Sequence, residues 1–352
     1  MTTCHRSRLI LILILFPSRA LANMGTPLMW TSTLHLVFGN AIIGVIEGIL
    51  LGALFKTSKV KAVLVLIIAN YTSAWVGGFA VTQTLPSLID FTLCNIKFWF
   101  LVFVVTSFLL TLLLELPFVW GILRNQKCSL RKAFKATTLI HGVSYTVLFV
   151  LYWSASGTSI MTQLQVVSPN EIKLPTPFNL YYITPKGDDV LGMNLNTPNS
   201  IKHVAKIAPP YKNSPLYVRV RATSGYDLVI PHPIQTIKDP SEDLLILENF
   251  STQSINPLTD TTQVPSLIKE SDWTFYTGFW AIEGISGQNK KTGERFKFSL
   301  ELPFVKWYVS DAAQITEEHI ILLLGGDQIC LIHLPSKRIA LITRGSSPIV
   351  AL

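Results

Sequence analysis

Residues 35–81 read HLVFGNAIIGVIEGILLGALFKTSKVKAVLVLIIANYTSAWVGGFAV, and the architecture of the chain follows from them. They hold two apolar segments, at about His35 to Phe55 and Ala62 to Val81, joined by a short loop with three lysines. Each segment is close to the roughly 20 residues that a helix needs to cross the hydrocarbon core of a bilayer. The stretch therefore predicts two transmembrane helices that form a hairpin.

A second apolar pair follows, at about Phe98 to Leu123 and Leu139 to Trp153, with another basic loop between its segments. Short loops rich in lysine and arginine stay on the cytoplasmic side of a membrane. We therefore expect residues 23–156 to form a four-helix transmembrane domain with both basic loops in the cytoplasm. The basic residues of the two loops are Lys56, Lys59, Lys61, Arg124, Lys127, Arg131, Lys132 and Lys135.

The N-terminal residues 1–22 have the pattern of a secretory signal peptide. A basic stretch ends at Arg8, an apolar run extends from Leu9 to Phe16, and Ala20-Leu21-Ala22 forms a small-residue cleavage site. Cleavage after Ala22 places the mature N-terminus outside the cytoplasm, in agreement with the basic loops. The sequence predicts a multi-pass protein of a bacterial inner (plasma) membrane with a periplasmic C-terminal domain.

Composition supports a membrane protein and excludes several other classes. Of the 352 residues, 49% are hydrophobic and 14% are charged, against about 25% charged in an average globular chain. The net charge of +8 comes from the N-terminus and the basic loops, so the C-terminal part lacks the basic face that nucleic-acid binding requires. Cys4, Cys94, Cys128 and Cys330 lie far apart without zinc-finger spacing, which argues against a disulfide scaffold or a structural zinc.

The two hairpins carry similar polar residues in the same order. The first has Glu47, Asn70 and Ser73 in the pattern E-x22-N-x2-S, and the second has the pattern E-x25-H-x2-S. Because both hairpins run in the same direction, a duplication would give parallel repeats related by an axis along the membrane normal. The patterns predict such a tandem repeat.

Helical spacing collects these polar residues on one face of each helix, at similar depth. Since a carboxylate that faces lipid is costly, the polar faces should turn inward and form one cluster. The cluster either relays protons or binds a cation, or its hydrogen bonds hold the helices together, with intramembrane catalysis as a third reading. The sequence does not decide whether it binds a metal. The expected members are Glu47, Asn70, Ser73, Glu115, His141, Ser144 and Tyr145.

Three glycines in the first helix, Gly44, Gly48 and Gly52, form a ridge with a spacing of four residues. Such a ridge lets another helix backbone approach closely. We expect it to pack inside the bundle rather than to form a dimer.

The remaining chain predicts a linker over residues 157–178 and an all-β domain over residues 179–352. Arg295 to Leu302 alternates strictly between polar and apolar residues, as a half-buried strand does. Ala312 to His319 has a possible helical period. Two segments with Gly187-Asp188 and Gly326-Asp327 turns share a strand-turn-strand rhythm that resembles the blades of β-propeller proteins. A β-sandwich fits nearly as well.

The functional reading of the sequence is broad. The chain contains no GxSxG, HExxH, Walker or GxGxxG motif, so neither an enzyme nor a bound cofactor is predicted. The first hypothesis is a non-enzymatic anchor or sensor whose β-rich domain binds an envelope protein. The alternative is a small transporter or an ion- or proton-conducting protein that uses the intramembrane polar residues. The expected partners are the lipid bilayer and the envelope protein, and the sequence leaves the oligomeric state open.

Overall fold

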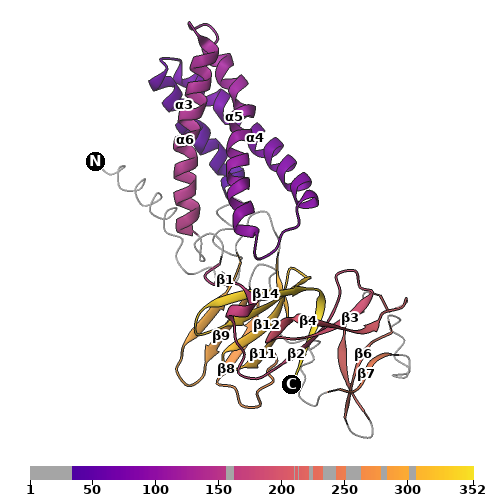
Figure 1. The fold of residues 1–352 in the computed structure, drawn as a ribbon. Coiled ribbons are helices and arrows are strands. Elements are labelled where there is room, and N and C mark those ends of the chain that lie inside the picture. The colour runs from indigo at the N-terminus through magenta and orange to yellow at the C-terminus, as the bar shows by residue number, and fades with distance from the viewer. Residues whose placement is uncertain are drawn as a thin grey trace. The chain divides into compact units, whose positions relative to one another are not determined.

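The chain has two units, a helical one followed by a β-rich one, in the computed structural model of Figure 1. The predicted signal peptide lies outside the described residues. The second unit begins at Thr162 and also includes Thr92–Cys94. The described residues are 34–155, 162–209, 211–212, 214–221, 225–232, 243–250, 263–278, 284–300 and 307–352, without the side chains of 78–87 and 199.

The helical unit confirms the prediction of four long apolar helices. A π-helical turn, η1 (His35–Gly39), continues into α3 (Asn40–Leu54), and α4 (Lys59–Leu88), α5 (Ile96–Leu123) and α6 (Ser129–Ala155) follow. All four are long and apolar enough to cross a membrane. Helix α6 begins ten residues before the predicted start at Leu139, because the polar first turns still bury Ala133, Ala136 and Thr137.

The bundle has polar residues inside and apolar residues outside. Glu47 and Glu115 have 0% of their surface exposed, whereas Val105 is 57% and Leu113 is 67% exposed. In water this distribution would leave large apolar side chains unburied, so it matches a bundle whose solvent is lipid.

The glycine ridge of α3 lies against α4 of the same chain. A Cβ atom added at Gly48 would lie 2.4 Å from Val63 Cα, and one added at Gly44 would lie 2.6 Å from Ile67 Cα. At Gly52 the nearest atom would be Lys59 Cγ at 2.6 Å. The ridge therefore allows close packing of α3 against α4 in the first hairpin.

The described strands of the β-rich unit form four sheets. The five-stranded sheet has the order β1 (Gln165–Val167), β14 (Arg338–Arg344), β13 (Gln328–His333), β12 (His319–Leu324) and β11 (Val309–Thr316). The four-stranded sheet has the order β15 (Ser346–Ala351), β2 (Asn179–Ile183), β3 (Asp189–Asn194) and β4 (Thr197–Lys206). Two three-stranded sheets are formed by β5 (Tyr217–Val220), β6 (Tyr226–Ile230) and β7 (Leu244–Phe250), and by β10 (Arg295–Phe298), β9 (Ile285–Asn289) and β8 (Trp273–Thr277).

The two largest sheets share one apolar core. All six residues of β12, sequence HIILLL, are buried, as expected for a central strand. Leu180 and Tyr182 of β2 contact the same core as Ile321 and Leu331 from the larger sheet. All neighbouring strands are antiparallel except β1 and β14, which pair in parallel.

The propeller-like arrangement is not found. Both Gly-Asp turns do join antiparallel strands, since Gly187-Asp188 lies between β2 and β3 and Gly326-Asp327 lies between β12 and β13. Within the described residues, however, these meanders belong to sheets that form neither a propeller nor a closed barrel. Strand rhythm is a local property, whereas the arrangement of sheets depends on contacts between distant strands.

Two further expectations differ from the structure. The possible helix at Ala312 to His319 is wrong, because Ala313 and Gln314 belong to β11 and pair with Ile321 and Ile320 of β12. Ladder pairing and burial outweigh the local helical period there. Within the expected linker, Gln165–Val167 forms β1, and the 3-10 turn η2 (Pro169–Glu171) follows it. The polar sequence does not reveal this short edge strand.

Candidate functional site

Glu47 of α3 is a buried carboxylate that contacts two other helices. Its Oε2 accepts a hydrogen bond from Asn70 Nδ2 of α4 at 2.7 Å. Its Oε1 accepts a hydrogen bond from Ser144 Oγ of α6 at 2.6 Å and lies 2.9 Å from His141 Nδ1. Both oxygens of Glu47 thus have partners, although the side chain is buried.

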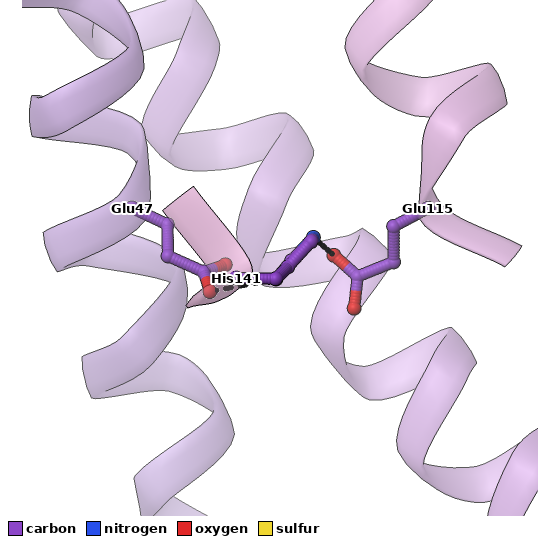
Figure 2. Close-up of side chains that lie close together, drawn as sticks. All are labelled: Glu47, Glu115 and His141. Carbon is purple, nitrogen blue, oxygen red and sulfur yellow. Dashed lines mark hydrogen bonds and ion pairs between the residues drawn. The ribbon is translucent and has the colours of Figure 1, made fainter. Parts of the chain in front are cut away.

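His141 of α6 lies between two carboxylates, as Figure 2 shows. Its Nδ1 faces Glu47, and its Nε2 lies 3.3 Å from Oε2 of Glu115 on α5. Because a carboxylate accepts hydrogen bonds, each contact favours a proton on the ring nitrogen that faces it. A protonated imidazole can therefore donate toward both glutamates, whereas a neutral one that donates to Glu47 turns the lone pair of Nε2 toward Glu115.

Glu115 is less well satisfied than Glu47. Its Oε1 accepts a hydrogen bond from Ser73 Oγ at 2.5 Å. Within the described part of the chain, neither its Oε2 nor Nε2 of His141 makes a hydrogen bond, although both atoms are buried. Buried polar atoms are rarely left in this state, since each costs about 1–3 kcal/mol. The two atoms have only an ion-pair contact with each other at 3.3 Å, so they are the least satisfied part of the cluster.

The contacts of the two hairpins follow a reciprocal pattern. Each glutamate faces the nitrogen-bearing residue of its own hairpin, which is Asn70 for Glu47 and His141 for Glu115. Each also accepts a hydrogen bond from the serine of the other hairpin, Ser144 or Ser73. The contact of His141 with Glu47 has no counterpart and breaks the symmetry.

The charge of the cluster calls for a positive partner. At a site that is 0–1% exposed, two ionised carboxylates leave a net charge of −2 around a neutral imidazole and −1 around a protonated one. The desolvation penalty for such charges is several kcal/mol per ion unless they are compensated. A bound cation or added protons can supply the compensation.

The three titratable side chains are also close enough to hold a metal ion. One ligand atom from each of Glu47, Glu115 and His141 lies within 4.8 Å of the other two. Among the described residues, this is the one group in which three or more His, Cys, Asp or Glu side chains come this close. Imidazole nitrogen and carboxylate oxygen are common ligands of divalent metal ions.

Six of the seven expected cluster residues come together, and Tyr145 does not reach the carboxylates. Its hydroxyl lies 2.8 Å from Thr111 Oγ1 on α5. Sequence analysis missed a further polar contact, His35 Nδ1 to Tyr152 OH at 2.6 Å. The signal for it was weak, because both residues read as ordinary ends of apolar segments.

The β-rich unit has its own polar groups but no comparable cluster in its described residues. Arg221 donates a hydrogen bond to Asp227 at 2.7 Å and holds the pKa of that carboxyl below its usual range. Burial raises the pKa of Tyr217 to about 12, and its hydroxyl donates to Asp243. These contacts tie β5, β6 and the start of β7 together.

Comparisons with known proteins add no function to this geometry. No protein-family model matches the chain, and the search of curated proteins gave no significant match. The contacts among Glu47, Glu115 and His141 are therefore the main indication of function.

Proposed function

We propose that the chain is a small multi-pass membrane protein that transports or conducts a cation through a centre inside its helix bundle. The observation that carries the proposal is the position of His141 between Glu47 and Glu115. Ionisable residues inside transmembrane segments are rare and typically mark ion pathways. Here two acidic groups and one imidazole from three helices meet at one point.

Orientation in the membrane is supported by the basic loops. Gln126 Nε2, after α5, donates a hydrogen bond to the carbonyl oxygen of Phe55, after α3, at 3.0 Å. The two basic connections therefore lie at the same end of the bundle. By the positive-inside rule this arrangement supports a cytoplasmic location of that end. We propose that the β-rich unit lies outside the cytoplasm and that the helices cross the inner membrane of a bacterium.

The reciprocal contacts support the tandem duplication predicted from the sequence. Parallel repeats bring equivalent residues together around an axis along the membrane normal, and transporter sites commonly lie at such repeat interfaces. Glu47 and Glu115 occupy equivalent positions in the two sequence patterns, and polar side chains from both hairpins contact each of them. A cluster at such an interface supports the proposal of an ion site in a duplicated transporter.

The test is cation flux in vesicles that contain the purified full-length chain. Vesicles loaded with indicators for protons, potassium, magnesium or zinc should show flux of at least one cation above that of protein-free vesicles. Glu115→Gln should abolish that flux, because it removes the negative charge but retains an oxygen for Ser73. Gly121→Ala is the control, since nothing lies within 4 Å of the added Cβ. Absence of any protein-dependent flux, or undiminished flux in Glu115→Gln, overturns the proposal.

A second candidate function is a membrane anchor or sensor whose β-rich unit binds an envelope protein. It is favoured because both carboxylate oxygens of Glu47 already have polar partners within the bundle. Glu47 faces three polar side chains from two other helices, which is also what a purely structural cluster requires. This candidate predicts that no cation crosses the vesicle membrane and that Glu115→Gln alters only stability. The flux experiment therefore separates the two functions.

A further inference from the structure

We infer that the cation bound at this centre is a divalent first-row transition metal ion such as Zn²⁺, with Glu115 Oε2 and His141 Nε2 as its direct ligands. The inference rests on the proposed function and names the chemical class of its cation. It would give a common partner to two buried atoms that make no hydrogen bond and have only an ion-pair contact with each other.

The separation of these two atoms matches a metal-bound pair. Zn²⁺ binds imidazole nitrogen and carboxylate oxygen at about 2.0–2.2 Å with tetrahedral angles, so two such ligand atoms lie about 3.3 Å apart. Glu115 Oε2 and His141 Nε2 are 3.3 Å apart, in an ion-pair contact that lacks the geometry of a hydrogen bond. The atoms thus already have the spacing that the ion requires.

Glu47 has the position of the residue that orients a metal-binding histidine. The imidazole nitrogen that does not bind the metal usually donates its hydrogen to a carboxylate, which sets the tautomer and the ring orientation. Glu47 Oε1 lies 2.9 Å from Nδ1 of His141. Asn70 and Ser144 in turn hold the Glu47 carboxylate. We therefore assign Glu47 as a positioning residue, and it also contributes negative charge.

Ligand type and charge favour this class over other cations. Magnesium and calcium take oxygen ligands, whereas imidazole suits zinc, iron and similar ions. One divalent ion balances two carboxylates around a neutral imidazole, whereas a monovalent ion leaves a net charge of −1 in a buried site. Charge balance matters here because Glu47, Glu115 and His141 are at most 1% exposed.

The test is zinc binding by the full-length chain in detergent, with a tag that contains no histidine. After equilibrium dialysis against buffered zinc and excess magnesium, elemental analysis should find one zinc per chain. His141→Gln and Glu115→Gln should lose it, and Glu47→Gln should bind about 10–100-fold more weakly. His203→Gln is the matched control, because His203 Nε2 lies 2.9 Å from Asp189 on the exposed surface.

A measurement on the unmodified chain guards against variants that fail to fold. X-ray absorption of the zinc-loaded protein should show scattering from one imidazole and otherwise oxygen ligands. Failure to bind zinc over magnesium, unchanged binding in His141→Gln, or a spectrum without imidazole overturns the inference. Flux of protons or potassium without zinc binding would support the proposed function and refute the inferred metal site. Zinc binding without any flux would support the metal site and refute the proposed function.

Discussion

Glu47 and Glu115 are the same residue type at the same depth of burial, yet their environments differ. Glu47 has polar partners at both carboxylate oxygens, whereas Glu115 has a hydrogen bond at one oxygen and faces His141 with the other. A carboxylate held by several donors is fixed in place, whereas an oxygen that accepts no hydrogen bond retains capacity for a ligand. This difference assigns orientation to Glu47 and binding to Glu115.

His319 in β12 is a buried histidine that is only 2% exposed. Burial, together with the neighbouring His333, lowers its pKa to about 4, although the nearby Glu318 acts in the opposite direction. In the unfolded chain the His319 imidazole therefore binds a proton near pH 6.5, whereas in the folded chain it does so only near pH 4. Stability is complete above pH 6.5 and falls as the pH drops through this window, by about 2 kcal/mol between pH 7 and 5.

Thermal unfolding of the β-rich unit in the full-length chain, followed across that pH range, measures the effect. His319→Gln should remove most of the pH dependence, because glutamine does not titrate. His203→Gln, at an exposed histidine, should leave it unchanged. An equal pH slope in His319→Gln and the unmodified chain would contradict the assignment.

Among the elements, the pair α3 and α4 depends most on small residues. At Gly48 a Cβ atom would come 2.4 Å from Val63 Cα, and the blocking atom is backbone, which cannot rotate away. The close approach also brings Glu47 of α3 within hydrogen-bond distance of Asn70 on α4. The ridge thus positions the site as well as the helices.

Gly48→Ala should therefore separate the two helices and destabilise the bundle by about 1–3 kcal/mol, the usual cost of overpacking. Gly121→Ala on α5 adds a Cβ with nothing within 4 Å, so it should be neutral or stabilise by up to about 1 kcal/mol. Unfolding in detergent, followed by tryptophan fluorescence, compares the two. Equal stability of both variants would refute the role of the ridge.

At the scale of the whole molecule, the arrangement of charge predicts which ends of the helices face the cytoplasm. Exposed Cys128 follows α5 in a basic connection, and exposed Cys94 precedes α5 at its other end. Cys330 is buried. The native cysteines therefore serve as reporters of orientation.

A membrane-impermeant maleimide should label Cys94 in intact spheroplasts and Cys128 only after permeabilisation. Cys94→Ser should remove the first signal and Cys128→Ser the second, while Cys330→Ser changes neither. Labelling of Cys128 in intact spheroplasts would reverse the proposed orientation.

Local patterns in the sequence were sufficient for the four apolar helices, the polar face of each helix and the Gly-Asp hairpins. Hydropathy, helical periodicity and turn chemistry all act over a few residues, so they can be read along the chain. The residues of the polar cluster were identifiable for the same reason, because a carboxylate in an apolar helix must face inward.

Tertiary structure decided which of these residues meet. The packing of the two hairpins determines that Ser73 donates to Glu115 and that Ser144 donates to Glu47. It also places His141 between the two carboxylates. The same holds for β1, which pairs with β14 more than 160 residues away in sequence, and for Ala313 and Gln314, which are drawn into β11 by β12. In these places burial and strand pairing between distant segments outweigh the local conformational preference. Such contacts contribute to stability only once the chain has folded.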